Sequence, residues 1–520
     1  MRGDARAAIQ SPVSDSIPQN DRPDEGWLSR PSIQWKPGRR WLALALALFA
    51  LVSWAAVTPH GIHASWRECD TQAIARNFLI DGFDLTRPRV DWRGDSDGAV
   101  ECEFPLYQAL VAVALRAAGD VEWPGRLISL FCIVLTSLAL HRLLEQRSGG
   151  VAALAGTLVF LSSGQALLLS SRVTPDALSL ALAVAGIATY VAYLAEGRGA
   201  ALWLAATALA LAVLQKPTAL QAALLLLGWT AVLAPRRLRE TRLWAASLGA
   251  LALVVVWLAH GASLHAQTGL TFGVLSGGDT KFPALEHLLD PALHVHLAKT
   301  TARYGLSLFG LAALAVLALR RRLDRSDLVL LGTVLVGLIG TLRYSYNVGM
   351  GAHYHAFAAM AGSYFVARAW PQRTPRWFLA LFALALVAHG GWQFARECGI
   401  KERNARADVL EIARALQSVS EENELAVIRA EKPERDEFWK RRNNYEDPRI
   451  LYHARRRGWV VPIDGLDEQA LEDLVLRGAR LLVDVTPHAS QSPFTAWLAR
   501  RAELVLEQGR ARVYRLRPRS

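Results

Sequence analysis

Long uncharged apolar runs are the feature that most constrains how this chain can fold. They recur from Trp41 to Phe394, whereas the segment after Arg396 has the composition of a soluble domain. A helix needs about 20 apolar residues to cross the roughly 30 Å hydrocarbon layer of a membrane. Because lipid offers peptide groups no hydrogen-bond partner, a spanning segment must be a helix or part of a closed barrel. The Leu- and Ala-rich runs do not alternate as barrel strands do, which predicts membrane-spanning helices.

The sequence predicts about eleven spans. They lie at residues 41–59, 124–144, 150–170, 176–195, 200–214, 217–234, 242–262, 303–320, 327–342, 352–369 and 376–394. The first run follows a long polar tail rather than the short basic segment of a signal peptide, so we expect it to remain as a helix. Residues 105–119 are also apolar, but as a helix they rise only about 22 Å and they include Arg116. We expect this segment to lie at the membrane interface.

Clusters of arginine predict which helix ends face the cytosol. With the N-terminus inside, all five inner connections carry basic residues, among them those at 236–242 and 320–325, as the positive-inside rule requires. We therefore expect a disordered cytoplasmic tail at residues 1–40, a multi-pass domain at 41–394 in the inner membrane of a cell, and an extracytoplasmic C-terminus. The same topology accounts for the formal net charge of +12, so a nucleic-acid partner is not expected.

Residues 395–520 predict a small α/β domain on the outer surface. Buried strands are expected at 424–428 and 479–484, with a helix across 467–476 between them. Two further strand candidates lie at 502–506 and 511–516. The expected fold is therefore an all-α polytopic membrane domain followed by an extracytoplasmic α/β domain.

Unusual polar residues collect at the outer helix ends. The first outer loop, residues 60–104, is long and acidic, and the other outer connections add both acids and bases. The candidates for a polar site are Asp70, Asp91, Glu101, Glu103, Arg172, Asp176, Lys216, Arg343, His353 and Tyr354. A charge at bilayer depth costs roughly 2.5–3.5 kcal/mol, so it needs a partner or a water-filled cavity. Lys216 and Asp176, taken singly, also fit ordinary helix-end residues. Together these residues predict a site that faces outward.

Several stretches resemble bacterial relatives of the protein O-mannosyltransferases, a group that includes the lipid A aminoarabinose transferase and has the GT-C fold. The start of the first outer loop, Arg67-Glu-Cys-Asp70-Thr-Gln-Ala-Ile-Ala-Arg-Asn77, is the most specific of them. The shorter stretches are Val90-Asp91-Trp92-Arg-Gly94, Glu101-Cys-Glu103-Phe-Pro105, Arg172-Val-Thr-Pro-Asp176, Gln215-Lys216-Pro217, Asn347 to Tyr354 and, more loosely, Asp447 to His453 and Gly458-Trp459 in the tail domain.

The resemblance implies a membrane glycosyltransferase with a polyprenyl-phosphate-linked sugar donor. In this family an acid after the first helix acts on the acceptor, and Asp70 matches its position. A carboxylate that takes the proton of an attacking hydroxyl makes that hydroxyl a better nucleophile. The leaving phosphate needs cations and hydrogen-bond donors instead, for which Lys216, Arg343 and His353 are candidates, with Arg172 and Tyr354 next. Direct attack by a lipid, glycan or protein acceptor would invert the anomeric carbon.

Glu103 marks a departure from the family. The family pattern is Glu-Lys-Pro-Pro, where this chain has Glu103-Phe-Pro-Leu. The missing lysine shifts the expected phosphate contact to Lys216 or Arg343. Glu103 itself could hold the acceptor, orient Asp70 or cap the helix that follows. Asp176 begins a helix, where a carboxylate favours the helix dipole, and the resemblance adds a role in lining the site.

The cysteines and possible metal ligands leave alternatives open. Cys69 and Cys102 both lie in the first outer loop, each beside a proposed site acid, so we expect a disulfide between them or else two thiols. Asp95-Ser-Asp97 has the spacing of a metal-dependent sugar-nucleotide site, but its flanking glycines favour a turn. The histidines at 287, 294 and 296 form no established ligand pattern. No cofactor is required by the sequence, although a divalent metal remains compatible with it.

Two other classes of protein compete with the glycosyltransferase reading. A polytopic transporter or lipid-carrier flippase would use the outer polar cluster as its substrate mouth, but such proteins often contain internal repeats, and we find none between the halves of this chain. A membrane scaffold whose exported domain does the work is the third possibility. Nothing in residues 395–520 resembles a catalytic constellation.

Overall fold

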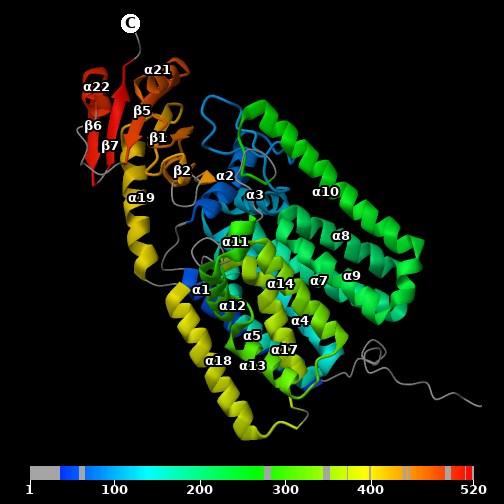
Figure 1. Ribbon diagram of the computed structural model, residues 1–520. Coiled ribbons are helices and arrows are strands. Elements are labelled where there is room, and N and C mark those ends of the chain that lie inside the picture. Colours follow the sequence, from blue (N-terminus) through cyan, green and yellow to red (C-terminus); the bar gives the residue numbers. More distant parts are fainter. Residues whose placement is uncertain are drawn as a thin grey trace, which may run out of the picture.

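A computed structural model gives the fold as a helical bundle with a small α/β domain at one end (Figure 1). It describes residues 36–57, 65–274, 283–342, 352–371, 373–397, 400–436, 441–442, 445–485, 493–509 and 511–517. Most of the expected cytoplasmic tail, residues 1–35, lies outside these ranges, as does Arg343.

Helices stand at every predicted span. The bundle consists of α1 (Lys36–Val57), α4 (Trp123–Ser148), α5 (Gly150–Leu161), α6 (Gly164–Ser171), α7 (Pro175–Glu196), α8 (Gly199–Gln215), α9 (Leu220–Leu233), α10 (Thr241–Thr268), α12 (Pro291–Tyr304), α13 (Ser307–Leu319), α14 (Arg325–Gly340), α17 (Ala356–Ala369) and α18 (Arg376–Glu397). Three short 3-10 turns, η1 (Pro217–Ala219), η2 (Pro235–Arg239) and η3 (Ala352–His355), join or precede them. The helical positions are confirmed.

The number of spans is a separate matter. By length and apolar composition, four of the described helices can each cross a membrane: α4, α7, α10 and α18. The number reaches six if the bent pairs α5–α6 and α12–α13 each form one span. Several helices at other predicted spans are shorter, such as α8 with 17 residues and α17 with 14. The expected eleven spans are therefore not confirmed by helix length.

Two predicted spans are broken. Residues 150–170 form α5 and α6, which bend by 60° where Ser163 begins a new helix and its hydroxyl accepts a hydrogen bond from the Ala166 amide. The prediction for 303–320 was wrong at its start, because α12 ends at Tyr304 and α13 leaves at 100° from Ser307. The chain packs closely at this second bend, since a Cβ on Gly362 would come within 2.3 Å of the Leu306 carbonyl oxygen.

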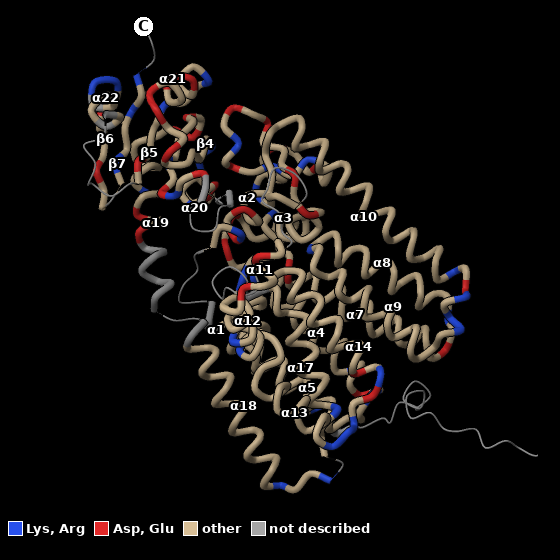
Figure 2. The backbone as a smooth tube through the Cα atoms, viewed as in Figure 1, with Lys and Arg blue, Asp and Glu red and all other residues tan. Residues whose placement is uncertain are grey.

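The helices differ in how much they are covered by protein. Figure 1 shows α4, α5, α7 and α17 in the middle of the bundle, with α10 and α18 along its flanks. Most of α7 is buried, whereas only a small share of α10 and of α18 is buried inside the protein. Figure 2 shows charged residues gathered at the two ends of the bundle and few between them. This is the distribution expected of helices whose flanks face lipid.

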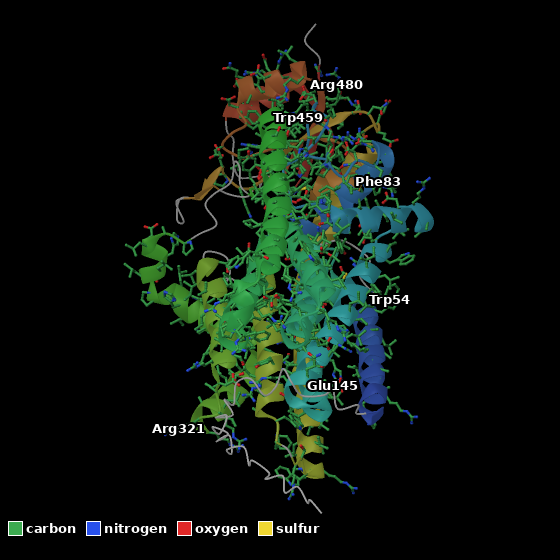
Figure 3. All side chains as sticks on the ribbon, turned by 90° about the vertical axis from the view of Figure 1, so that its right-hand side faces the viewer. Trp54, Phe83, Glu145, Arg321, Trp459 and Arg480 are labelled. Carbon is green, nitrogen blue, oxygen red and sulfur yellow. The ribbon has the colours of Figure 1, made fainter. Side chains whose placement is uncertain are left out.

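A buried ion network joins three helices at the end of the bundle far from the α/β domain. Asp327 of α14 is fully buried and pairs with Arg368 of α17 at 2.9 Å. Arg147 of α4 contacts Asp324 and lies 3.8 Å from Asp327, and Tyr364 donates a hydrogen bond of 2.9 Å to Asp327. Figure 3 places Glu145 and Arg321 at this end and Trp459 and Arg480 at the opposite one.

Two helices of the first outer segment lie between the bundle and the α/β domain. They are α2 (Trp66–Ile80) and α3 (Leu106–Ala118), and the short α11 (Leu285–Leu289) belongs to a later outer connection. The expected helix at 105–119 is confirmed as α3, whose 13 residues rise only about 20 Å. It is too short to cross a membrane unaided.

The tail domain has the predicted α/β fold. Its elements are α19 (Ile400–Ser418), β1 (Leu425–Arg429), β2 (Arg435–Asp436), β3 (Arg441–Arg442), α20 (Arg449–Ala454), β4 (Gly458–Val461), α21 (Glu468–Leu476), β5 (Ala479–Asp484), α22 (Pro493–Arg501), β6 (Ala502–Gln508) and β7 (Ala511–Leu516). The strand order is β4-β1-β5-β7-β6, with β1 parallel to β4 and β5 and the other pairs antiparallel. The four predicted strands and the helix between them are confirmed; β4 and the pair β2–β3 were not predicted.

The tail domain and the first outer segment share one hydrophobic core. Side chains of α2, α3 and the loop between them pack in the same cluster as side chains of α19, α20, β1, β5 and β7. Gly94 donates a backbone hydrogen bond of 2.6 Å to Gly458, and Gly458 donates one of 3.2 Å back to Asp91. Gly94 has φ +57° and lies against the Trp459 ring, so a side chain would not fit there. The Asp95-Ser-Asp97 segment is a turn, and Asp95 pairs with Arg477 of the tail.

Candidate active site

Helix α2 carries the best-matched candidate residue and is buried almost throughout its length. It begins with a capping box, in which the Ser65 hydroxyl accepts from the Glu68 amide and the Glu68 carboxylate accepts from the Ser65 amide. Glu68 also accepts a hydrogen bond of 3.2 Å from the Val173 amide, which ties α2 to the turn between α6 and α7. This helix is therefore held at the outer end of the bundle by its own N-terminal residues.

Asp70 lies on α2 with its carboxylate turned towards the first outer loop. It is buried, and Trp92 Nε1 donates a hydrogen bond of 2.9 Å to Asp70 Oδ1. Burial disfavours the charged form and raises the pKa of Asp70 to about 8, although the Trp92 hydrogen bond and the nearby Arg67 oppose that rise. A carboxyl group with a pKa near neutrality is suited to accept and release a proton.

Beside Asp70 lies a charged cluster of four residues: Arg67, Glu103, Lys216 and Asp176. One carboxylate bridges two cations, because Glu103 Oε2 pairs with Arg67 and Glu103 Oε1 lies 3.3 Å from Lys216 Nζ. Lys216 Nζ is also 3.8 Å from Asp176. Burial alone would raise the pKa of Glu103, but Arg67 and Lys216 outweigh it and hold that pKa well below its usual value. Glu103 is therefore ionised at neutral pH.

Gln215 brings two distant segments of the cluster together. Its side-chain amide donates a hydrogen bond of 2.6 Å to the Phe104 carbonyl, and its side-chain oxygen accepts one of 3.1 Å from the Tyr107 amide. The Phe104 amide donates a hydrogen bond of 2.9 Å to the Leu214 carbonyl. The end of α8 is thus fastened to the start of α3, which places Lys216 against Glu103.

Two predicted site residues have structural partners instead. The buried Asp91 carboxylate accepts hydrogen bonds of 2.5 Å from Arg76 and 3.0 Å from Asn77. These bonds connect the loop to α2. Glu101 accepts a hydrogen bond from Thr271, and its backbone bonds to Leu270 and Phe272. Both acids therefore stabilise the first outer loop, one turned towards α2 and the other towards the segment after α10.

Of the remaining candidates, the structure describes Asp176, Tyr354 and Arg172. Asp176 stands in the first turn of α7, where it contacts Lys216 and also favours the helix dipole. Tyr354 of η3 lies near Lys216. Arg172 ends α6, beside the Val173 amide that Glu68 holds. Arg343 and the side chain of His353 lie outside the described residues.

The expected disulfide between Cys69 and Cys102 is not formed. The Cys69 sulfur lies 3.8 Å from Nε2 of His453 in α20. The Cys102 thiol instead donates a hydrogen bond of 3.1 Å to the Glu103 carbonyl. Cys69 faces the tail domain because it lies on a different face of α2 from Asp70. The first outer loop is fixed by ion pairs and by the core it shares with the tail.

Neither of the metal patterns considered in the sequence forms a cluster. Among the described residues, no group of three or more His, Cys, Asp or Glu side chains is arranged to hold a metal ion. His294 instead hydrogen-bonds through Nε2 to the Leu288 carbonyl at 2.8 Å.

Three residues of the site were not among the candidates. Arg67 precedes Asp70 by three positions, and residues at this spacing share a helix face, so the motif did contain a signal for it. Trp92 stands in a quoted motif, but only the fold turns its indole towards Asp70. Phe272 lies under the Arg67 guanidinium, 4.8 Å from its carbon to the ring centre, and nothing in the sequence marks it.

Two comparisons with known proteins, one with family models and one with solved structures, give matches. The sequence profile described as dolichyl-phosphate-mannose-protein mannosyltransferase matches residues 103–260, a range that includes Glu103, Asp176 and Lys216. Comparison with curated protein sequences gives no match.

Solved structures of similar fold are glycosyltransferases. ArnT from Cupriavidus metallidurans in the apo state is 14% identical, with 92% of this chain and 98% of that chain covered and a TM-score of 0.58. The same enzyme bound to undecaprenyl phosphate is 14% identical, with 91% and 98% covered and a TM-score of 0.59. The arabinofuranosyltransferase AftD from Mycobacteria is 15% identical over 92% of this chain and 40% of that chain, with a TM-score of 0.55. The chain therefore has the GT-C fold of these structures, and its residues 103–260 match the family model of the dolichyl-phosphate-mannose-protein mannosyltransferases.

Proposed function

We propose that this protein transfers a sugar from a polyprenyl-phosphate-linked donor to a hydroxyl of a lipid, glycan or protein acceptor on the extracytoplasmic side of the membrane. The observation that carries the proposal is the buried carboxyl of Asp70 beside a cluster containing Arg67 and Lys216. A base and an anion-binding group are the two requirements of this reaction.

Asp70 acts as the base. The acceptor oxygen attacks the anomeric carbon, the bond from that carbon to the phosphate oxygen breaks, and the hydroxyl proton passes to Asp70. The phosphate leaves with the electron pair and stays an anion, so it needs no proton from the protein. One direct displacement inverts the anomeric carbon.

Cations at the end of α8 and in the neighbouring outer connections receive the phosphate. Lys216 and Arg172 are described residues among the cations expected from the sequence, with Tyr354 close to Lys216, and Arg343 and His353 complete the set. A similar fold, that of ArnT, has been solved with undecaprenyl phosphate bound. A lipid-linked phosphate also suits a site at the end of helices with apolar flanks, because its chain can remain in the bilayer.

The orientation follows from charge. The site and the tail domain lie at one end of the bundle, and Arg321 and the buried ion network lie at the other (Figure 3). Since arginine-rich connections stay in the cytosol, the site faces the extracytoplasmic side. A donor that has been moved to that side by its lipid carrier is the one the site can reach.

A reconstituted assay tests the proposal against the transporter alternative. Purified full-length protein in proteoliposomes receives radiolabelled polyprenyl-phosphate sugars together with an extract of envelope lipids and glycans. We expect label to move from the polyprenyl phosphate to an acceptor, with release of polyprenyl phosphate. Movement of the intact labelled donor across the bilayer without transfer would replace the proposed function with that of a flippase.

The pH dependence of the reaction should reflect the raised pKa of Asp70. A base must be ionised, so below its pKa the rate constant falls about tenfold for each pH unit. With a pKa of about 8, kcat/KM is expected to rise between pH 6 and pH 8 and to level off above that. Trp92→Phe removes the hydrogen bond that favours the carboxylate, so its profile should move to higher pH. A wild-type profile that is already flat from pH 5 would contradict this assignment.

A further inference from the structure

We propose that Arg67 is a ligand of the donor phosphate, and that Glu103 and Phe272 hold its guanidinium in position for that role. The inference rests on the proposed function and adds a substrate-binding residue to it. Arg67 stands on α2 three residues before Asp70, where Glu103 of the first outer loop pairs with it and Phe272 of the segment after α10 packs against it.

The guanidinium is oriented on two sides. Phe272 lies under it at 4.8 Å, and Glu103 takes the hydrogen bond from its Nη2. Phe272 is itself held by two contacts. Its amide donates a hydrogen bond of 2.8 Å to the Glu101 carbonyl, and its ring packs against that of Trp92 with 6.0 Å between the ring centres. The ring of Trp92 thus contacts Phe272 while its indole nitrogen holds Asp70, so the base and the cation share one support.

One donor of Arg67 is left for a ligand. Its Nε is buried and has no hydrogen-bond partner among the residues that the structure describes. A buried donor without a partner is unfavourable, and a phosphate oxygen would satisfy it. About a quarter of the side chain is exposed, whereas the Glu103 side chain beneath it is 8% exposed, so a ligand can reach the arginine without removing Glu103.

Glu103 sets the spacing of a pair of cations. It holds Arg67 through one oxygen and Lys216 through the other, so the two cations stand side by side. A phosphodiester offers two unsubstituted oxygens, which suit one cation each. Arginine adds a planar fork that matches a phosphate better than an ammonium does.

The spacing along α2 suits an inverting displacement. Side chains three residues apart on a helix have Cβ atoms about 5–6 Å apart. An acceptor oxygen held by Asp70 and a phosphate oxygen held by Arg67 can therefore flank one sugar carbon between them. Each helps a different end of the reaction, the base at the attacking oxygen and the cation at the leaving oxygen.

Binding of undecaprenyl phosphate to the full-length protein in detergent tests this inference. We expect Arg67→Gln to raise the Kd for undecaprenyl phosphate at least tenfold, and Arg67→Lys to raise it about threefold or more because the fork is lost. Arg87→Gln is the matched control, since Arg87 is a half-buried arginine of the first outer loop that pairs with Asp97 rather than with the charged cluster, and its Kd should stay within about twofold of wild type. Undecaprenol, which has the chain but no phosphate, should bind all four proteins equally.

The outcomes separate this inference from the proposed function. Unchanged binding of undecaprenyl phosphate by Arg67→Gln overturns the inference, and so does an equal loss of undecaprenol binding, which indicates a structural role. If Arg67→Gln fails to fold, Arg67→Lys carries the test, because it keeps the charge that Glu103 needs; unchanged binding by it overturns the inference. Failure of the wild-type protein itself to bind undecaprenyl phosphate counts instead against the proposed function.

Discussion

Replacing Asp70 with asparagine is expected to lower the rate of sugar transfer by roughly 10²- to 10⁴-fold, the usual contribution of a general base. Asparagine has nearly the same volume, and its oxygen can still accept the hydrogen bond from Trp92 Nε1. It cannot take a proton from the acceptor. The loss should therefore appear in kcat, while the Kd for the polyprenyl phosphate and the thermal stability change little.

The comparison needs a carboxylate that lies in the same loop but outside the site. Asp84 is such a residue, because it is partly exposed and caps its own turn by accepting from Thr86. Asp84→Asn should transfer sugar at close to the wild-type rate. Transfer by Asp70→Asn within a few-fold of wild type would remove Asp70 from the role of base, whatever the control shows.

Loss of Asp327 is expected to produce the largest decrease in stability. This fully buried carboxylate balances Arg368 at 2.9 Å and Arg147 at 3.8 Å and accepts from Tyr364. Asp327→Ala leaves the buried guanidinium of Arg147 and the half-buried guanidinium of Arg368 with only Asp324 between them. Removing one partner of a buried ion pair costs about 3–5 kcal/mol, because the remaining charge is left uncompensated.

Thermal unfolding in detergent measures this effect. The melting temperature of Asp327→Ala should fall well below that of wild type, whereas Glu196→Ala, which removes an exposed carboxylate paired with Arg198, should leave it unchanged. Because the network lies at the end of the bundle away from Asp70, the molecules that remain folded should keep their transfer rate. A melting temperature equal to that of the control would show that the network contributes little to stability.

Local sequence patterns predicted only part of the candidate site. The resemblance marked the stretch around Asp70 but did not predict that it forms helix α2; once that helix is known, the spacing of Arg67 and Asp70 puts them on one helix face. That Lys216 meets Glu103 could not be read from the chain, because 113 positions separate them and Gln215 makes the connection through the backbone of Phe104 and Tyr107. For the same reason, the sequence alone could not assign Asp91 and Glu101 to structural partners.

The sequence by itself determined many elements of this protein: helices at the predicted spans of the bundle, the bounds of β5 and β7, the helical form of α3 and the α/β character of the tail. Apolar periodicity is a local property, and so it survives without knowledge of the fold. Only the tertiary structure decided the bends at Ser163 and Ser307, the separation of Cys69 from Cys102, and the single core that joins the tail to α2. These depend on close packing and on charge pairs between segments distant in the chain, which no local pattern records.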